Sequence, residues 1–263
     1  MAKTEGGWLQ GKRVLVSRPA AQAEGLARAI AAEGGLAIKC PVLNIEPVIE
    51  TPLDRQRVVN LDGYEGVIVV SRNAATLGLA RIDRFWPQLP AHLRWFAVGK
   101  STATCLKGDG IKPLVPDSGF NSEALLAMSE LSASAAAKLH QPKLLILKGE
   151  GGRELLEEQL TERGFSVDAL PLYRRTTSCY TPQQIANLLA DGPPDALVAT
   201  SVDILMAMDS LFQEAISNRF ELPLVVASER IAVAAKELGY QRIISAASAS
   251  DESITQALNV IAL

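Results

Sequence analysis

Hydroxyl, glycine and cationic residues follow short apolar runs at six places in the chain. Hydroxyls and the backbone N–H groups at helix starts donate hydrogen bonds to anions, and nearby cations add favourable charge. We therefore expect these groups to form a ligand-binding site. The candidates, with Ser122 added as a predicted helix cap, are Ser17, Arg18, Ser71, Arg72, Asn73, Gly99, Lys100, Ser101, Ser122, Lys148, Gly149, Gly151, Gly152, Arg153, Thr200, Ser201, Ser228 and Arg230.

Each candidate also has a purely structural interpretation. A single cation is as often a solvated surface charge or a member of a helix-end ion pair as a ligand contact. A single hydroxyl is more often a helix N-cap than a ligand contact. The prediction therefore rests on the groups together. The hydroxyls expected to cap helices are Ser71, Ser101, Ser122, Thr200, Ser201 and Ser228.

The sequence has few residues that could form a histidine-based, cysteine-based or nucleotide-binding site. The only histidines are His92 and His140, and Cys40, Cys105 and Cys179 show no CxxC spacing. A histidine triad, a zinc site and a disulfide framework are therefore not expected. The segment GEGGRE, residues 149–154, lacks the glycine order and the Gly-Lys-Ser/Thr ending of nucleotide-binding loops.

The composition favours a soluble globular protein of two domains. The chain has 263 residues, of which 48% are hydrophobic and 21% charged, and its net charge is −3. An acidic chain without a basic run is unsuited to sequence-independent nucleic-acid binding. The first ten residues lack the apolar core of a secretory signal, and no run of 18 uncharged apolar residues occurs. We expect a cytoplasmic protein that binds neither nucleic acid nor a membrane.

The two halves of the chain repeat one pattern of strands and helices with an offset of about 130 residues. Each half begins with a short apolar run, followed by a helical pattern that ends at glycine and by a second extended run before a proline. A third and a fourth apolar run follow at matching positions. The paired segments are 14–18 and 144–148, 36–40 and 165–169, 66–71 and 196–201, and 95–99 and 224–228.

Alternating strands and helices predict parallel sheets with helices on both faces. We expect an α/β protein with two flavodoxin-like domains, each a doubly wound parallel sheet. In such sheets ligands bind outside the carboxyl ends of the strands, where the polar groups above lie. With two domains, the cleft between them is the expected site.

The order and spacing of several segments resemble the uroporphyrinogen-III synthase family from about Arg13 to about Asp251. These segments are VLVSRP, SRNA, AVGKSTA, SGFNSEALL, LKGEGGRELLEEQLTERGFSVDALPLYRR, ATS and ASERIAVAAKELG. The resemblance implies two domains joined by a two-stranded β-ladder. Domain 1 would comprise residues 1–41 and 175–263, domain 2 residues 42–174, with connectors near 41–48 and 170–178. The family resemblance also implies that the protein is a flexible monomer.

The resemblance implies the activity as well. Members of that family are lyases that close the linear tetrapyrrole hydroxymethylbilane, with loss of water and inversion of ring D, into uroporphyrinogen III for heme and siroheme. No cofactor or metal is implied. Tyr173 in PLYRR resembles the tyrosine that the family places facing the cleft, where it could protonate the departing hydroxyl. Its alternative role is that of an amphipathic tyrosine packed where the domains join.

Two non-catalytic functions are alternatives. Duplicated α/β domains also form two-lobed binding proteins for sugars or tetrapyrroles, and a pathway regulator could keep the fold without the activity. The expected partners are the tetrapyrrole substrate and, in a transient contact, the preceding enzyme of the pathway.

Overall fold

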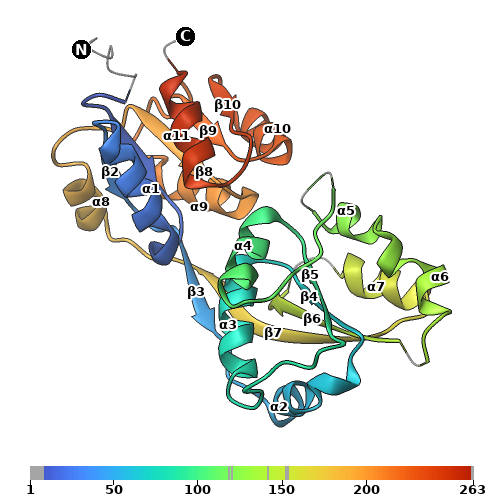
Figure 1. The fold of residues 1–263 in the computed structure, drawn as a ribbon. Helices are drawn as coiled ribbons and strands as arrows, with labels where there is room; N and C mark the ends of the chain where they lie inside the picture. The colour runs from blue at the N-terminus through green and yellow to red at the C-terminus, as the bar shows by residue number, and fades with distance from the viewer. Residues whose placement is uncertain (1–8, 118, 120, 141, 152–153, 262–263) are drawn as a thin grey trace, which may run out of the picture. The chain divides into compact units, whose positions relative to one another are not determined.

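The computed structural model describes residues 9–117, 119, 121–140, 142–151 and 154–261 (Figure 1). The chain divides into two compact units, residues 1–44 with 176–263 and residues 45–175. It enters unit 2 within β3 (Leu43–Pro47) and returns to unit 1 within β7 (Ser166–Thr177). The α/β class with two predominantly parallel sheets is confirmed.

Unit 1 contains a five-stranded sheet of order β10-β9-β8-β1-β2, in which all four neighbouring pairs are parallel. Its strands are β1 (Arg13–Val16), β2 (Leu36–Lys39), β8 (Ala196–Ala199), β9 (Leu224–Val226) and β10 (Ile243–Ser245). Its helices are α1 (Ala20–Ala32), α8 (Pro182–Leu188), α9 (Val202–Phe212), α10 (Glu229–Leu238) and α11 (Asp251–Asn259).

Both faces of this sheet are buried because successive strand side chains point to opposite sides. Leu15, Leu197 and Val226 pack with α9 and α10, whereas Val16 and Val198 pack on the other face with α1 and α11. Helix α10 ends at a glycine. Gly239 has a φ of 102°, a left-handed backbone that glycine adopts without the steric cost of a Cβ atom.

Unit 2 contains the second sheet, of order β3-β7-β6-β4-β5. The pairs among β7, β6 (Lys143–Gly149), β4 (Gly66–Val69) and β5 (Arg94–Ala97) are parallel. The helices of unit 2 are α2 (Pro52–Val59), α3 (Arg72–Ile82), α4 (Lys100–Gly108), α5 (Ser122–Leu126), α6 (Ala133–Ala136) and α7 (Leu155–Glu162), with 3-10 turns at Leu61–Gly63 and Ser129–Leu131.

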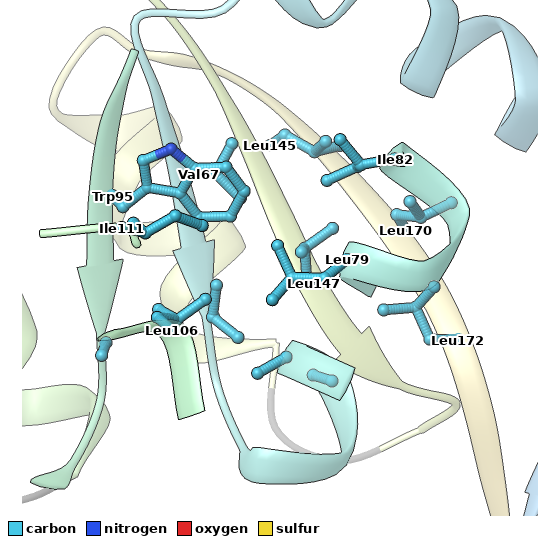
Figure 2. Close-up of a cluster of buried hydrophobic side chains, with 14 of the residues drawn as sticks. Val67, Leu79, Ile82, Trp95, Leu106, Ile111, Leu145, Leu147, Leu170 and Leu172 are labelled. Atoms are coloured by element: carbon cyan, nitrogen blue, oxygen red, sulfur yellow. The ribbon is translucent and has the colours of Figure 1, made fainter. Parts of the chain in front are cut away.

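One face of the second sheet packs against α3 and α4. Figure 2 shows Leu145 and Leu147 of β6 near Ile82 and Leu79 of α3, and Val67 of β4 beside Trp95. Trp95 and Trp86 belong to this cluster, the first buried and the second partly buried. The opposite face packs against α5, α6 and α7.

A charged network joins the amino ends of the strands in unit 2. Asp168 accepts a hydrogen bond from Tyr64 at 2.7 Å and forms an ion pair with Lys143 at 2.8 Å. Burial alone would raise the pKa of Asp168, but these two donors and the charges of Lys143 and Arg57 hold it below the ordinary value. The network lies at the edge opposite to the predicted site.

Among the described residues, every helix is too short or too polar to cross a bilayer.

Candidate active site

The hydroxyl of Tyr173 lies at the carboxyl edge of the sheet in unit 2. Its oxygen is 3.0 Å from Oγ of Ser71, and Nη2 of Arg175 donates a hydrogen bond to it at 3.4 Å. The guanidinium carbon of Arg175 also lies 5.6 Å from the centre of the tyrosine ring. The Tyr173 residue is only 1% exposed. The phenol is therefore held by two polar side chains in a covered position.

Two local features of β6 and β7 create this position. The register of the two strands shifts between Lys148 and Gly149, which brings Gly149 opposite Tyr173. A Cβ atom on residue 149 would lie 2.8 Å from ring atoms Cε2 and Cζ. The ring can therefore lie against the backbone only because residue 149 has no side chain. The backbone N–H of Glu150 completes the arrangement by donating to the carbonyl of Tyr173 at 2.7 Å.

Ser71 reaches the phenol from the end of β4. Its backbone is extended, and its Oγ accepts a hydrogen bond from the N–H of Ala74 at 3.0 Å, which makes it the N-cap of α3. A capping serine fixes its side chain because the hydroxyl bonds to the first turn of the helix. The predicted cap at Ser71 is confirmed, and the same hydroxyl also contacts Tyr173.

The other candidates of unit 2 differ in accessibility. Lys148 lies within β6 and forms an ion pair with Glu157 of α7, so its charge is already compensated. Arg72, Lys100 and Ser101 are exposed in the first turns of α3 and α4, and Asn73 is partly exposed. Gly99 is the N-cap residue of α4, and Gly151 has a φ of 68° in the loop after β6. Gly152 and Arg153 lie outside the described residues.

Two predicted caps in unit 2 are wrong. Asn121 caps α5 through its side chain, so Ser122 is the first helical residue. Helix α4 begins at Lys100 after Gly99, which places Ser101 inside the first turn. Helix ends vary by a residue according to the local backbone, and sequence spacing alone does not resolve such shifts.

In unit 1, Ser17 and Arg18 are buried. Oγ of Ser17 donates to the carbonyl of Val198 at 2.8 Å. The guanidinium of Arg18 forms an ion pair with Asp251 at 2.5 Å and donates to the carbonyl of Ala249 at 2.7 Å. Both side chains thus stabilise the carboxyl edge of this sheet from within.

The remaining candidates of unit 1 lie at the starts of α9 and α10. Ser201 caps α9 by accepting from the N–H of Ile204 at 3.1 Å, which confirms that prediction. Ser228 occupies the N-cap position of α10 without a side-chain cap bond, so its hydroxyl does not serve as the predicted cap. Arg230 is exposed, and Ser228 lies directly before the first turn of α10. The predicted cap at Thr200 is wrong, because Thr200 lies one residue before the capping serine, where it is partly exposed.

Sequence reasoning missed Arg175. It lies two residues after Tyr173 in an extended segment, so both side chains leave the same face of the strand. That spacing could have identified it. In the part of the chain that the structure describes, no group of three histidine, cysteine, aspartate or glutamate side chains is placed to hold a metal ion.

Comparisons with known proteins agree on one family. The family model of uroporphyrinogen-III synthase HemD matches residues 24–256. The uroporphyrinogen-III synthase of Salmonella typhimurium is 32% identical over 93% of this chain and 99% of that protein. The corresponding Escherichia coli protein is 31% identical over 93% of this chain and 99% of its own length.

A solved structure agrees on the fold. The crystal structure of a mutant uroporphyrinogen III synthase from the bacterium Thermus thermophilus covers 96% of this chain and 99% of that chain, with a TM-score of 0.61 and 19% identity. Because the family match extends over most of the sequence, the chain belongs to the uroporphyrinogen-III synthase family.

Proposed function

We propose that this protein is a lyase that closes hydroxymethylbilane into uroporphyrinogen III, with loss of water and inversion of ring D. Family membership supports the reaction. The observation that carries the proposal in the structure is the pair of hydroxyls, Tyr173 and Ser71, 3.0 Å apart at the carboxyl edge of a parallel sheet.

The reaction needs a proton donor more than a base. Electrons from the pyrrole nitrogen expel the terminal hydroxyl, which must gain a proton to leave as water, and an electrophilic azafulvene remains. Phenols and alcohols carry their protons at neutral pH, so they suit this step. Tyr173 is the proposed source of the proton. No cofactor or metal is part of the proposal.

The substrate carries eight carboxylates, and we propose that strand-end groups of both units bind some of them. Arg18 and Lys148 form ion pairs within the protein. Because Arg72, Lys100 and Arg230 are exposed to solvent, they are the better candidates for carboxylate binding. Backbone N–H groups and accessible hydroxyls at the helix starts would supply further donors without a permanent basic patch.

The finer description of the fold is also a proposal. The strand orders support two flavodoxin-like domains, because β1 and β6, the strands that begin the two halves of the repeat, each have neighbouring strands on both sides. The adjacency of β3 and β7 supports a two-stranded ladder as the connection between residues 1–41 with 175–263 and residues 42–174. The monomeric state, the cytoplasmic location and transient contact with the preceding enzyme stay predictions.

The test is to supply freshly made hydroxymethylbilane and to resolve the ring isomers formed. Spontaneous closure yields isomer I, so isomer III in excess of a protein-free control would support the proposal. We expect Tyr173→Phe to lower turnover at least about tenfold with little effect on folding. Isomer I alone from the folded wild-type protein would refute the proposed function and favour a two-lobed binding protein or a regulator without catalysis.

A further inference from the structure

We propose that Ser71 presents the proton to the leaving hydroxyl, that Tyr173 replaces the proton that Ser71 gives up, and that Arg175 stabilises the phenolate that remains. The inference rests on the proposed function and deepens it. It follows from the hydrogen bonds around two oxygen atoms and from the burial of one of them.

Counting donors and acceptors limits the possible arrangements. Arginine and backbone N–H groups only donate, whereas a hydroxyl has one hydrogen and two acceptor sites. Arg175 donates to the Tyr173 oxygen, and the N–H of Ala74 donates to Ser71 Oγ. One hydrogen remains to be placed between the two hydroxyl oxygens, and either residue could provide it.

Burial decides between the two arrangements. If Ser71 donated to Tyr173, the phenolic hydrogen would have to find another acceptor around a residue that is 1% exposed. A buried O–H without an acceptor costs free energy, and native structures avoid it. If Tyr173 donates to Ser71, both acceptor sites of Ser71 are filled and its own hydrogen stays available for an acceptor outside this pair, because Ser71 is only partly buried. The second arrangement satisfies every group.

The relay balances in protons and electrons. The C–O bond of the substrate breaks with its electron pair on oxygen, which takes the Ser71 proton and leaves as water. Ser71 takes the proton of Tyr173, and the pyrrole nitrogen lone pair forms the new double bond of the azafulvene cation. The resulting phenolate keeps the hydrogen bond from Arg175 and the attraction of its charge. When the attacking pyrrole carbon loses its proton after ring closure, that proton returns through Ser71 to Tyr173.

Substitutions can separate the relay from helix capping. Ser71→Asn keeps an acceptor for the N–H of Ala74 but has no acidic hydroxyl, whereas Ser71→Thr keeps both functions. We expect Ser71→Asn and Tyr173→Phe each to lower kcat about 10²-fold with KM nearly unchanged. The kcat of the double variant should be no lower than that of the slower single variant. Ser71→Thr should retain most of the activity.

Arg175 has a matched control in the neighbouring Arg174, an exposed arginine that pairs with Glu150. Arg175→Met should lower kcat about tenfold or more, since it removes a charged donor from the phenolate. This loss should disappear in the Tyr173→Phe background, and Arg174→Met should keep wild-type kcat. An undiminished kcat in Ser71→Asn, or additive effects of Arg175→Met and Tyr173→Phe, would overturn the relay.

A second readout does not depend on activity. Neutron diffraction from wild-type crystals in which labile hydrogens are exchanged for deuterium should place the Tyr173 hydroxyl deuterium on the line to Ser71 Oγ. A deuterium on Ser71 directed at the phenol oxygen would overturn the inference even if isomer III is formed. Conversely, absence of isomer III with the expected deuterium position would refute the proposed function while upholding the hydrogen-bond direction.

Discussion

Replacing Gly149 with alanine should displace the ring of Tyr173. The added Cβ would lie 2.8 Å from Cε2, 2.8 Å from Cζ and 3.2 Å from the phenol oxygen. Comfortable carbon–carbon contacts begin at about 3.5 Å, so the ring must move by about 0.7 Å. The distance between the Ser71 and Tyr173 oxygens is already 3.0 Å. A shift of this size away from Ser71 breaks their hydrogen bond.

The expected consequences are measurable in two assays. Overpacking of this kind costs about 1–3 kcal/mol of folding free energy, which urea denaturation would report. A displacement approaching 1 Å at a reacting group costs up to about 10²-fold in rate. We therefore expect Gly149→Ala to lower the rate of isomer III formation at least about tenfold.

The matched control is Gly108→Ala in α4, where an added Cβ meets no atom within 4 Å. Alanine is the better helix former, so this variant should be unchanged or about 0.5–1 kcal/mol more stable, with normal activity. If Gly149→Ala retains wild-type turnover and stability, Tyr173 does not need its ring to lie against the backbone of residue 149, and the steric reasoning is refuted.

Three further results are expected. Asp168→Asn should lower the free energy of unfolding by about 1–2 kcal/mol at pH 7. Because the folded-state pKa of this carboxyl is lowered, its contribution is present above the unfolded pKa and lost as the pH falls through the folded value, so wild type and variant should converge in acid denaturation series. Burial raises the pKa of Cys40 to about 11, so maleimide should label exposed Cys179 in the native protein at pH 7 and reach Cys40 only on unfolding; early labelling of both would contradict this. In Gly25→Ala, the new Cβ would lie 2.2 Å from Oδ2 of Asp251, so the melting temperature should fall by several degrees; an unchanged value would show that Asp251 can move away at no cost.

Much of the local structure could be predicted because it depends on near neighbours in the chain. The offset of about 130 residues recurs in the observed elements, for example in β4 at Gly66–Val69 and β8 at Ala196–Ala199. Apolar runs of four or five residues, with glycine and serine at their ends, predict buried strands and helix starts wherever they occur. The caps at Ser71 and Ser201 follow from the same local chemistry, while Asn121 replaced Ser122 through a shift of one residue.

The partners of the site residues depended on the fold. Arg18 meets Asp251, which lies 233 positions away, and Tyr173 meets Ser71 at a separation of 102. No local pattern marks such pairs, because a cation after a strand looks the same whether it faces solvent or a distant carboxylate. Arg175 is an exception, since its spacing from Tyr173 in a strand already places both side chains on one face.

The alternation of apolar runs and helical patterns along the chain predicts the four pairs of matching strands and the order that each half repeats. The repeat alone does not show how the two halves combine, and the fold answers this question: β1 and β2 of the first half share a sheet with β8, β9 and β10 of the second, and β4 and β5 share a sheet with β6 and β7. The physical reason is that parallel strands join through backbone hydrogen bonds common to every residue, so near-identical apolar runs suit either sheet. Connection geometry and side-chain packing across the sheets select one pairing, and that pairing brings Ser71, Gly149 and Tyr173 together.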